Sequence, residues 1–244
     1  MANPTAAMLV IGDEILSGRT RDRNIGHLAE RLTGVGIDLC EVRIVPDRHA
    51  AIVEALRALS GSFDHVFTSG GIGPTHDDIT ADAVAAAFGV PIGVREDARA
   101  LLEAMVARSG IELNPARLRM ARIPEGARLI ENPVSLAPGF SLENVHVMAG
   151  VPAIFRAMVE SVLPGLAGGV PVISRTLRAD LPEGEIAGPL AEIAAAHDAV
   201  SIGSYPFILN GKFGANIVFR STEGAALDAA VKAFLAAFPD AREL

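Results

Sequence analysis

The stretch DHVFTSGGIGPTHDDIT, residues 64–80, carries the strongest structural signal in the chain. Its first six residues predict a buried strand, and the glycines that follow interrupt it. The alanine-rich residues 80–88 then predict a helix. A strand that leads through a glycine-rich loop into a helix is typical of α/β proteins, in which ligands bind beyond the carboxyl ends of parallel strands.

The segments on either side of this stretch repeat the alternation of strand and helix. We predict further strands at 6–12, 37–45 and 145–149, and further helices at 24–35, 49–59, 96–109, 114–122 and 153–163. Such alternation requires right-handed crossovers and places helices on both faces of the sheet. The sequence therefore predicts an α/β domain with a mostly parallel sheet, whose ligand edge is formed by the loops at Gly12, Pro46 and Gly70.

The pattern changes after the glycine-rich residues 165–171, which we interpret as a linker. Beyond it the sequence predicts the order β-α-β-β-α: strands at 172–178, 200–208 and 213–219, and helices at 183–197 and 223–238. The last two strands are joined around Asn210-Gly211, a hairpin turn signal. We therefore predict two domains, residues 1–168 and a small α+β domain at 169–244.

Composition excludes several classes of protein. The chain has 244 residues, half of them hydrophobic, and a formal net charge of −8. It lacks the basic excess that holds a nucleic-acid backbone, so we expect no nucleic-acid partner. No stretch reaches the ~18 uncharged apolar residues of a membrane span, and a single cysteine excludes an intramolecular disulfide. We expect a cytoplasmic protein without a membrane partner.

The glycine-rich loop has the composition of a phosphate-binding loop. Gly70, Gly71 and Gly73 permit positive φ angles, so that successive backbone amides can point at an anion beside a helix start. Ser69 and Thr75 can add hydroxyl donors. The alternative is that the glycines only turn the chain and that one of the following Asp or Thr residues caps the helix.

Acidic residues follow the same predicted strand ends. Asp13 or Glu14, Asp47, and Asp77 or Asp78 are expected to converge on one rim of a parallel sheet. Carboxylates repel a bound phosphate unless a divalent cation lies between them, and Mg²⁺ is commonly held by one or two carboxylates plus phosphate oxygens. Each acid taken singly is better explained as a solvated loop residue or a helix cap, but three at the strand ends of one sheet favour a functional role.

These motifs together resemble a known family. The residues that carry the resemblance are Gly12 to Gly18, Asn24, Pro46-Asp47, the stretch Ser69 to Thr80, residues 132–140 and Gly150-Val151-Pro152. They resemble the molybdopterin-binding (MoaB/Mog-like) domain of CinA-type competence/damage-inducible proteins over residues 5–165. The tail is similar to the small domain that follows in such chains, and the deamidase domain of long members has no counterpart here.

The resemblance implies a three-layer α/β/α fold and a metal-dependent nucleotide pyrophosphatase, a hydrolase that converts ADP-ribose-like substrates to AMP and a sugar phosphate with Mg²⁺ or Co²⁺. It implies Asp47, Asp78 and Glu14 as catalytic residues and Asp77 and Asp78 as metal ligands. The residues implied for binding the nucleotide or pterin are Asn24, Ser69, Gly70, Gly71, Gly73, Thr75, Asn132, Pro138 and Gly139. A homodimer is the oligomer that the family suggests.

Two other functions stay open at this point. Related Mog-type proteins adenylylate molybdopterin in molybdenum cofactor biosynthesis, and the chain could instead carry the pterin or act as a non-enzymatic nucleotide-binding module. The sequence departs from the family pattern at Ser135, where glycine is usual, and at Arg23, where threonine is usual. Ser135 leaves less room for backbone approach to a ligand in its loop.

Overall fold

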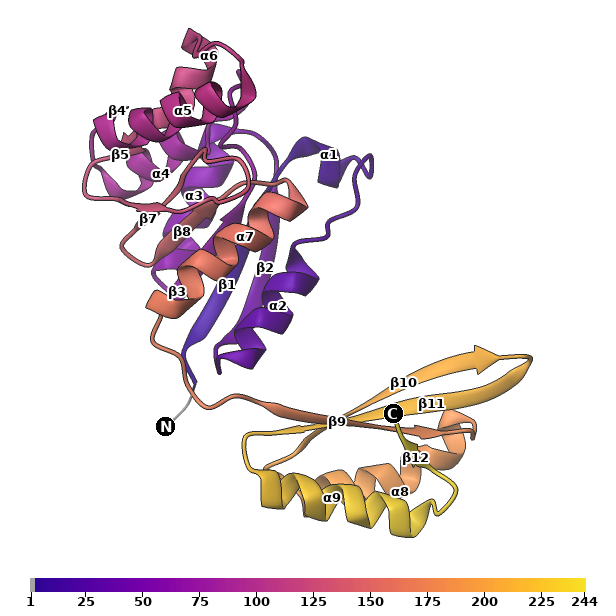
Figure 1. Ribbon diagram of the computed structural model, residues 1–244. Helices are drawn as coiled ribbons and strands as arrows, with labels where there is room; N and C mark the ends of the chain where they lie inside the picture. Colours follow the sequence, from indigo (N-terminus) through magenta and orange to yellow (C-terminus); the bar gives the residue numbers. More distant parts are fainter. Residues whose placement is uncertain (1–2) are drawn as a thin grey trace. The chain divides into compact units, whose positions relative to one another are not determined.

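A computed structural model describes residues 3–244, which divide into a first compact unit that ends at Gly169 and a second from Val170 to Leu244 (Figure 1). The first unit is built on a six-stranded sheet with the order β2-β1-β3-β8-β7-β6. Four neighbouring strands are parallel: β2 (Asp38–Val45), β1 (Thr5–Ile11), β3 (His65–Ser69) and β8 (Val145–Met148). The antiparallel strands β7 (Gly139–Leu142) and β6 (Arg128–Ile130) complete one edge.

Helices cover both faces of this sheet, as Figure 1 shows. The alternation of β1 explains the two layers: Ala7, Leu9 and Ile11 pack into one hydrophobic cluster, and Ala6, Met8 and Val10 into another. The first cluster includes residues of α3 (His49–Ser60), α4 (Thr80–Phe88) and α5 (Glu96–Ser109), and the second includes residues of α2 (Ile25–Gly34) and α7 (Pro152–Val162). The predicted three-layer α/β/α fold with a mostly parallel sheet is therefore confirmed.

Several short elements depart from the predictions. The predicted loop after Gly12 begins with the one-turn helix α1 (Asp13–Leu16), and the predicted helix at 114–122 is only α6 (Pro115–Leu118) followed by the 3-10 turn η1 (Arg119–Ala121). A two-stranded sheet of β4 (Ile92–Val94) and β5 (Arg122–Pro124) was not predicted, nor were β6 and β7. Strands of three or four residues are too short to show a period of two. A second 3-10 turn, η2 (Leu163–Gly165), ends α7.

The second unit is a four-stranded antiparallel sheet with two helices. Its strands lie in the order β10-β11-β9-β12, with β10 (Ser201–Leu209), β11 (Lys212–Ser221), β9 (Ile173–Ala179) and β12 (Arg242–Glu243). Helices α8 (Glu183–Ala196) and α9 (Gly224–Ala237) pack on one face and share a core with it. The predicted hairpin turn is confirmed, since Asn210 and Gly211 both have positive φ angles, 52° and 75°.

No helix in the described part of the chain is both long and apolar enough to span a membrane.

Candidate functional site

A cleft of about 550 Å³ lies at the carboxyl edge of the parallel strands of the first unit. Because β2, β1, β3 and β8 run parallel, the loops that follow them all reach this edge. The end of β2 contributes Asp47, and the end of β1 contributes Ile11 and Glu14. The glycine-rich loop follows β3, and residues 149–152 follow β8. The loop that precedes β7 supplies a further wall through Asn132, Ser135, Ala137 and Pro138. The cleft thus unites the motifs that the sequence spread over about 140 residues.

Tight backbone packing explains the glycines after β3. Gly70 and Gly71 have φ angles of 108° and 69°, a region that favours glycine. A Cβ atom would lie 2.3 Å from the Ile11 carbonyl oxygen at Gly70, 2.1 Å from Thr80 Oγ1 at Gly71 and 2.7 Å from Asp78 Oδ2 at Gly73. The backbone conformation and close packing therefore require glycine at Gly70 and Gly71, and a side chain at Gly73 would displace the Asp78 carboxylate.

The same loop presents unused backbone donors. The Gly70 amide donates to the Met148 carbonyl, and the Thr75 amide donates to Asp78 Oδ2 at 2.7 Å. Between them, the amides of Gly71, Ile72 and Gly73 donate no hydrogen bond to any residue of the described range 3–244. All three residues line the cleft. Successive free amides of this kind form a concave binding site for an anion.

Four carboxylates line the cleft, and its lining includes no lysine, arginine or histidine. The acids are Glu14, Asp47, Asp77 and Asp78, whereas Asp13 stays outside. Asp47 Oδ2 accepts the backbone N–H of Asp13 at 2.8 Å, which fixes the end of β2 against the start of α1. A phosphate bound to the loop amides would therefore meet a negatively charged wall.

The hydroxyl group of Thr75 bonds to one of these acids and is not left free in the cleft. Its hydroxyl donates a short hydrogen bond to Asp78 Oδ2, which also accepts the Thr75 amide. The nearby Thr75 side chain, and next the backbone amide of Asp77 itself, lower the pKa of the Asp77 carboxyl, so Asp77 is ionised at neutral pH. The expectation of a free hydroxyl donor for phosphate is thus not met at Thr75, because the neighbouring carboxylate takes it.

Asn24 and Ser69 lie outside the main cleft, in a smaller adjoining pocket. Both residues are buried, with 3% and 2% of their surface exposed. Asn24 Nδ2 donates to Ser69 Oγ and to the Gly150 carbonyl oxygen, each at 2.8 Å, and so joins the loops after β3 and β8. The structure therefore gives both residues a role in positioning the loops rather than one at the cleft surface. Asn24 Oδ1 is buried and has no hydrogen-bond partner in the described chain.

The loop before β7 is held together by Asn132. Its Nδ2 donates to Ser135 Oγ at 2.5 Å and to the Ala137 carbonyl at 2.8 Å, and its Oδ1 accepts the amides of Val134 and Ser135. Asn132 lines the cleft, as does Pro138, but its side chain organises the loop. Gly139 does not line the cleft: it is buried in β7, where a Cβ atom would lie 2.3 Å from the Val147 carbonyl oxygen. The sheet, rather than a ligand, requires this glycine.

The donor set fits a metal ion that arrives with its substrate. Among residues 3–244, no group of three or more His, Cys, Asp or Glu side chains is placed to hold a metal ion. Mg²⁺ in phosphate-processing sites is commonly held by one or two carboxylates together with substrate oxygens and water. The carboxylates that line the cleft could provide such a partial set, and Asp77 and Asp78 are the residues of the glycine-rich loop that would belong to it.

Two features of the cleft were not predicted from the sequence. Apolar side chains, among them Met120, Ile154 and Met158, also line it, as is usual in small-molecule sites. Arg119 lies just behind the glycine-rich loop, in a small adjoining cavity, and donates weakly to the Asp78 carbonyl oxygen at 3.4 Å. Neither Met120 nor Arg119 belongs to a recognisable motif, so only the fold reveals them.

The fold and cleft define a three-layer α/β domain with a glycine-rich loop at the carboxyl edge of its sheet. Residues 7–168 match the family described as probable molybdopterin binding domain, and residues 171–243 match the FAD synthase middle domain, which is not a deamidase domain. The chain therefore belongs to the molybdopterin-binding domain family, in its CinA-like branch.

Relatives and one solved structure support this membership. A CinA-like protein of Citrifermentans bemidjiense is 42% identical over 167 residues, which cover 66% of this chain but only 40% of the relative. A protein of Pyrobaculum calidifontis is 34% identical over 212 residues, 83% of this chain and 81% of the relative. The crystal structure of CinA from Thermoplasma acidophilum, described as of unknown function, matches with a TM-score of 0.61 at 34% identity, covering 66% of this chain and 97% of that one.

Proposed function

We propose that this protein is a metal-dependent nucleotide pyrophosphatase that hydrolyses ADP-ribose-like substrates to AMP and a sugar phosphate. One observation carries the proposal: three residues that line the cleft, Gly71, Ile72 and Gly73, have backbone amides that donate no hydrogen bond within the described chain, and the charged side chains that line it are all carboxylates. The amides suit a phosphate group, and the carboxylates suit the cation that a second phosphate needs beside them. A cytoplasmic location and a homodimer remain part of the proposal.

In this proposal the amides of Gly71, Ile72 and Gly73 hold one phosphate of the pyrophosphate. Asp77 and Asp78 would hold a divalent cation, which when bound polarises the phosphoryl group. Asp78 Oδ1 and Asp47 Oδ1 accept no hydrogen bond within the described residues, so either can orient water and take its proton. Water attacks one phosphorus atom and the P–O–P bond breaks, so that each product leaves with one phosphate. Glu14, which also lines the cleft, would assist in orienting the water.

Incubation with ADP-ribose and Mg²⁺ or Co²⁺, followed by chromatography, tests this proposal through the release of AMP. FAD is the second substrate to assay, because the second unit matches the FAD synthase middle domain and FAD contains the same pyrophosphate bond to AMP. Release of AMP from neither substrate with either metal would overturn the proposal.

The decisive variant is Asp78→Asn, which keeps an oxygen for the Thr75 amide but cannot take a proton. We expect AMP release to fall at least ~100-fold, the smallest usual contribution of a general base. The matched control is Asp64→Asn, because Asp64 Oδ2 accepts the amide and hydroxyl of Thr5, each at 2.8 Å, at the opposite end of β3. An equal loss in both variants would mean that the effect is structural, and full activity of Asp78→Asn would remove the assignment.

Molybdopterin binding, with adenylyl transfer or carriage of the pterin, is the second candidate. The family match over residues 7–168 favours it, and the apolar side chains of the cleft offer a surface for a pterin ring. Stoichiometric binding of molybdopterin by a protein that releases no AMP would favour this function over the first.

A further inference from the structure

The sheet of the second unit has one open face. Its other face packs on α8 and α9 through Leu177, Ala215, Ile217 and Phe219. Because side chains alternate along a strand, the residues between these point to the open face. The registers place Tyr205 opposite Asn216, Asn216 opposite Arg178 and Arg178 opposite Arg242, so one row of the open face crosses all four strands.

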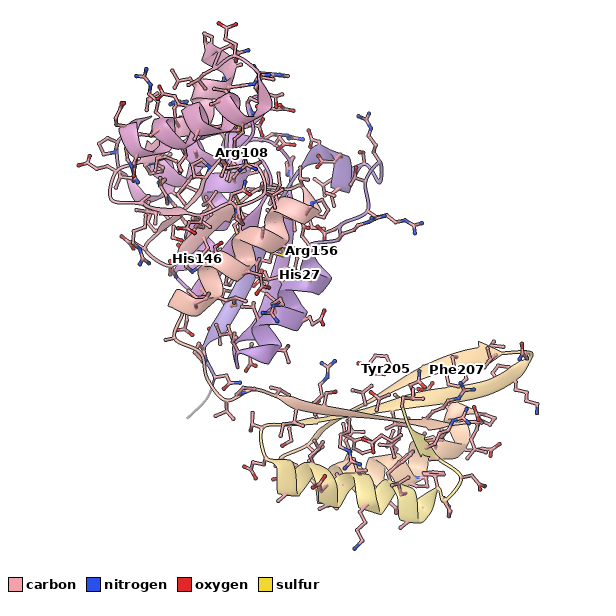
Figure 2. The ribbon with its side chains drawn as sticks, viewed as in Figure 1. His27, Arg108, His146, Arg156, Tyr205 and Phe207 are labelled. Atoms are coloured by element: carbon pink, nitrogen blue, oxygen red, sulfur yellow. The ribbon has the colours of Figure 1, made fainter. Side chains whose placement is uncertain are left out.

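Two aromatic rings lie on this face (Figure 2). The Tyr205 ring extends along β10 over Gly203, where a Cβ atom would lie 3.0 Å from the ring, and the Phe207 ring covers Gly214, where a Cβ atom would lie 2.3 Å from it. The Arg178 guanidinium lies 4.4 Å from the centre of the Phe207 ring. Tyr205 keeps 53% of its surface exposed. The glycines thus leave room for both rings, and because Arg178 lies over the Phe207 ring, Tyr205 supplies the exposed aromatic surface.

Positive charge gathers on the same face, although the second unit has more acidic than basic residues. Four of its cations are Arg178, Lys212, Arg220 and Arg242, whose registers all place them on the open face. Asp180 offsets part of this charge, since it bonds to Arg178 at 2.7 Å and lies 3.9 Å from Arg242. Lys212 and Arg220 form no ion pair within the described residues.

We propose that this open face binds a segment of single-stranded nucleic acid. An exposed aromatic ring such as that of Tyr205 stacks on bases of any sequence, and cations around it hold the phosphates. Lys212 and Arg220 stand eight residues apart on β11, a span of roughly 26 Å that exceeds a mononucleotide and suits several nucleotides of an extended strand. The net charge of −8, which argues against nucleic acid for the chain as a whole, conceals this local separation of charge.

Fluorescence anisotropy of a fluorescein-labelled octa-adenylate RNA, titrated with the full chain, tests this proposal. We expect saturable binding that weakens roughly tenfold when salt rises from about 50 to 200 mM. Tyr205→Ala should weaken binding at least fivefold, which corresponds to the low end of base stacking at ~1 kcal/mol, and Tyr205→Phe should stay within about twofold of the parent. AMP should compete poorly, since it can occupy one position only.

Phe213→Ala is the matched control, because Phe213 is also exposed (60%) on the same hairpin but belongs to the opposite face. It should bind like the parent. The emission of Tyr205, the single tyrosine in a chain without tryptophan, should be quenched by octa-adenylate after correction for absorption. No binding, equal losses in the Tyr205→Ala and Phe213→Ala variants, or competition by AMP as strong as by the octamer would each overturn the proposal. The assay does not depend on AMP release, so its result is separate from that of the first unit.

Discussion

At the scale of single residues, Gly71 is one of the tightly constrained positions of the cleft. Its φ angle of 69° and the 2.1 Å between a Cβ atom and Thr80 Oγ1 mean that any side chain strains the backbone and collides with Thr80. Thr80 cannot easily yield, because its hydroxyl donates to the Gly70 carbonyl oxygen at 3.0 Å within the buried base of the loop. Gly71, whose amide is one of those proposed to bind the ligand, is thus also required by the local fold.

We therefore expect Gly71→Ala to lower the free energy of unfolding by more than ~2 kcal/mol and to abolish phosphate binding. Gly89→Ala is the matched control, since Gly89 has nearly the same φ angle, 68°, but no atom within 4 Å of a Cβ position. It carries only the backbone cost, about 1–2 kcal/mol. Urea denaturation and calorimetric titration with inorganic phosphate measure the two effects. Equal destabilisation by both substitutions would show that the collision with Thr80 is relieved at no cost.

The sequence predicted which residues line the cleft better than it predicted what each of them does there. The glycine-rich loop and the acids Glu14, Asp47, Asp77 and Asp78 do line one cleft, because residue types at strand ends are visible in the sequence. The partners of each side chain are not visible there. Gly139 contacts the Val147 carbonyl oxygen of a neighbouring strand, which depends on the packing of the sheet, and the bond from Thr75 to Asp78 depends on the conformation of their shared loop.

At the scale of elements, β3, β7 and β8 surround the buried ring of His146, with the half-buried ring of His65 beside it. His146 on β8 lies with its ring centre 5.7 Å from that of His65 on β3, and its Nδ1 is 2.9 Å from Ser141 Oγ on β7. Burial, and next the charge of His65, lowers the pKa of His146 to about 3. His146 therefore stays neutral in the folded protein at pH values where the unfolded chain is protonated.

This shift makes the stability of the first unit depend on pH. The folded pKa lies below the unfolded value of 6.5, so the stabilisation is complete above pH 6.5 and is lost as the pH falls toward 3. We expect a loss of up to ~1.4 kcal/mol per pH unit in this window. His146→Asn, which cannot be protonated, should flatten the dependence measured by urea denaturation between pH 6.5 and 4.5. An unchanged slope in the variant would assign the acid sensitivity to other groups.

Long elements were predicted better than short ones, for a physical reason. The helices α2, α3, α7 and α9 each place several apolar residues on one face, and this period is legible over ten or more residues. Strands β6 and β7 have only three and four residues and pair antiparallel at the edge of a parallel sheet. Their position depends on neighbours rather than on their own pattern, so the chain offers no local signal for them.

At the scale of the whole molecule, the two units have separate hydrophobic cores and separate candidate sites. The cores of the first unit include no residue of the second, and every residue that lines the cleft lies between Ile11 and Met158. The open face of the second sheet is formed wholly by residues beyond Val170. Each unit therefore contains all the residues that its own proposed activity requires.

We accordingly expect a fragment of residues 1–169 to fold and to release AMP from ADP-ribose at a rate within about threefold of that of the full chain. The second unit supplies no residue of the cleft, so its removal should leave the interactions with the transition state intact. Circular dichroism and the AMP assay measure both properties. The complementary fragment, residues 170–244, should release no AMP but, if it folds, should bind octa-adenylate. With about 75 residues it is near the lower size limit for an independent domain. A folded 1–169 fragment without activity would mean that the second unit takes part in the chemistry of the first.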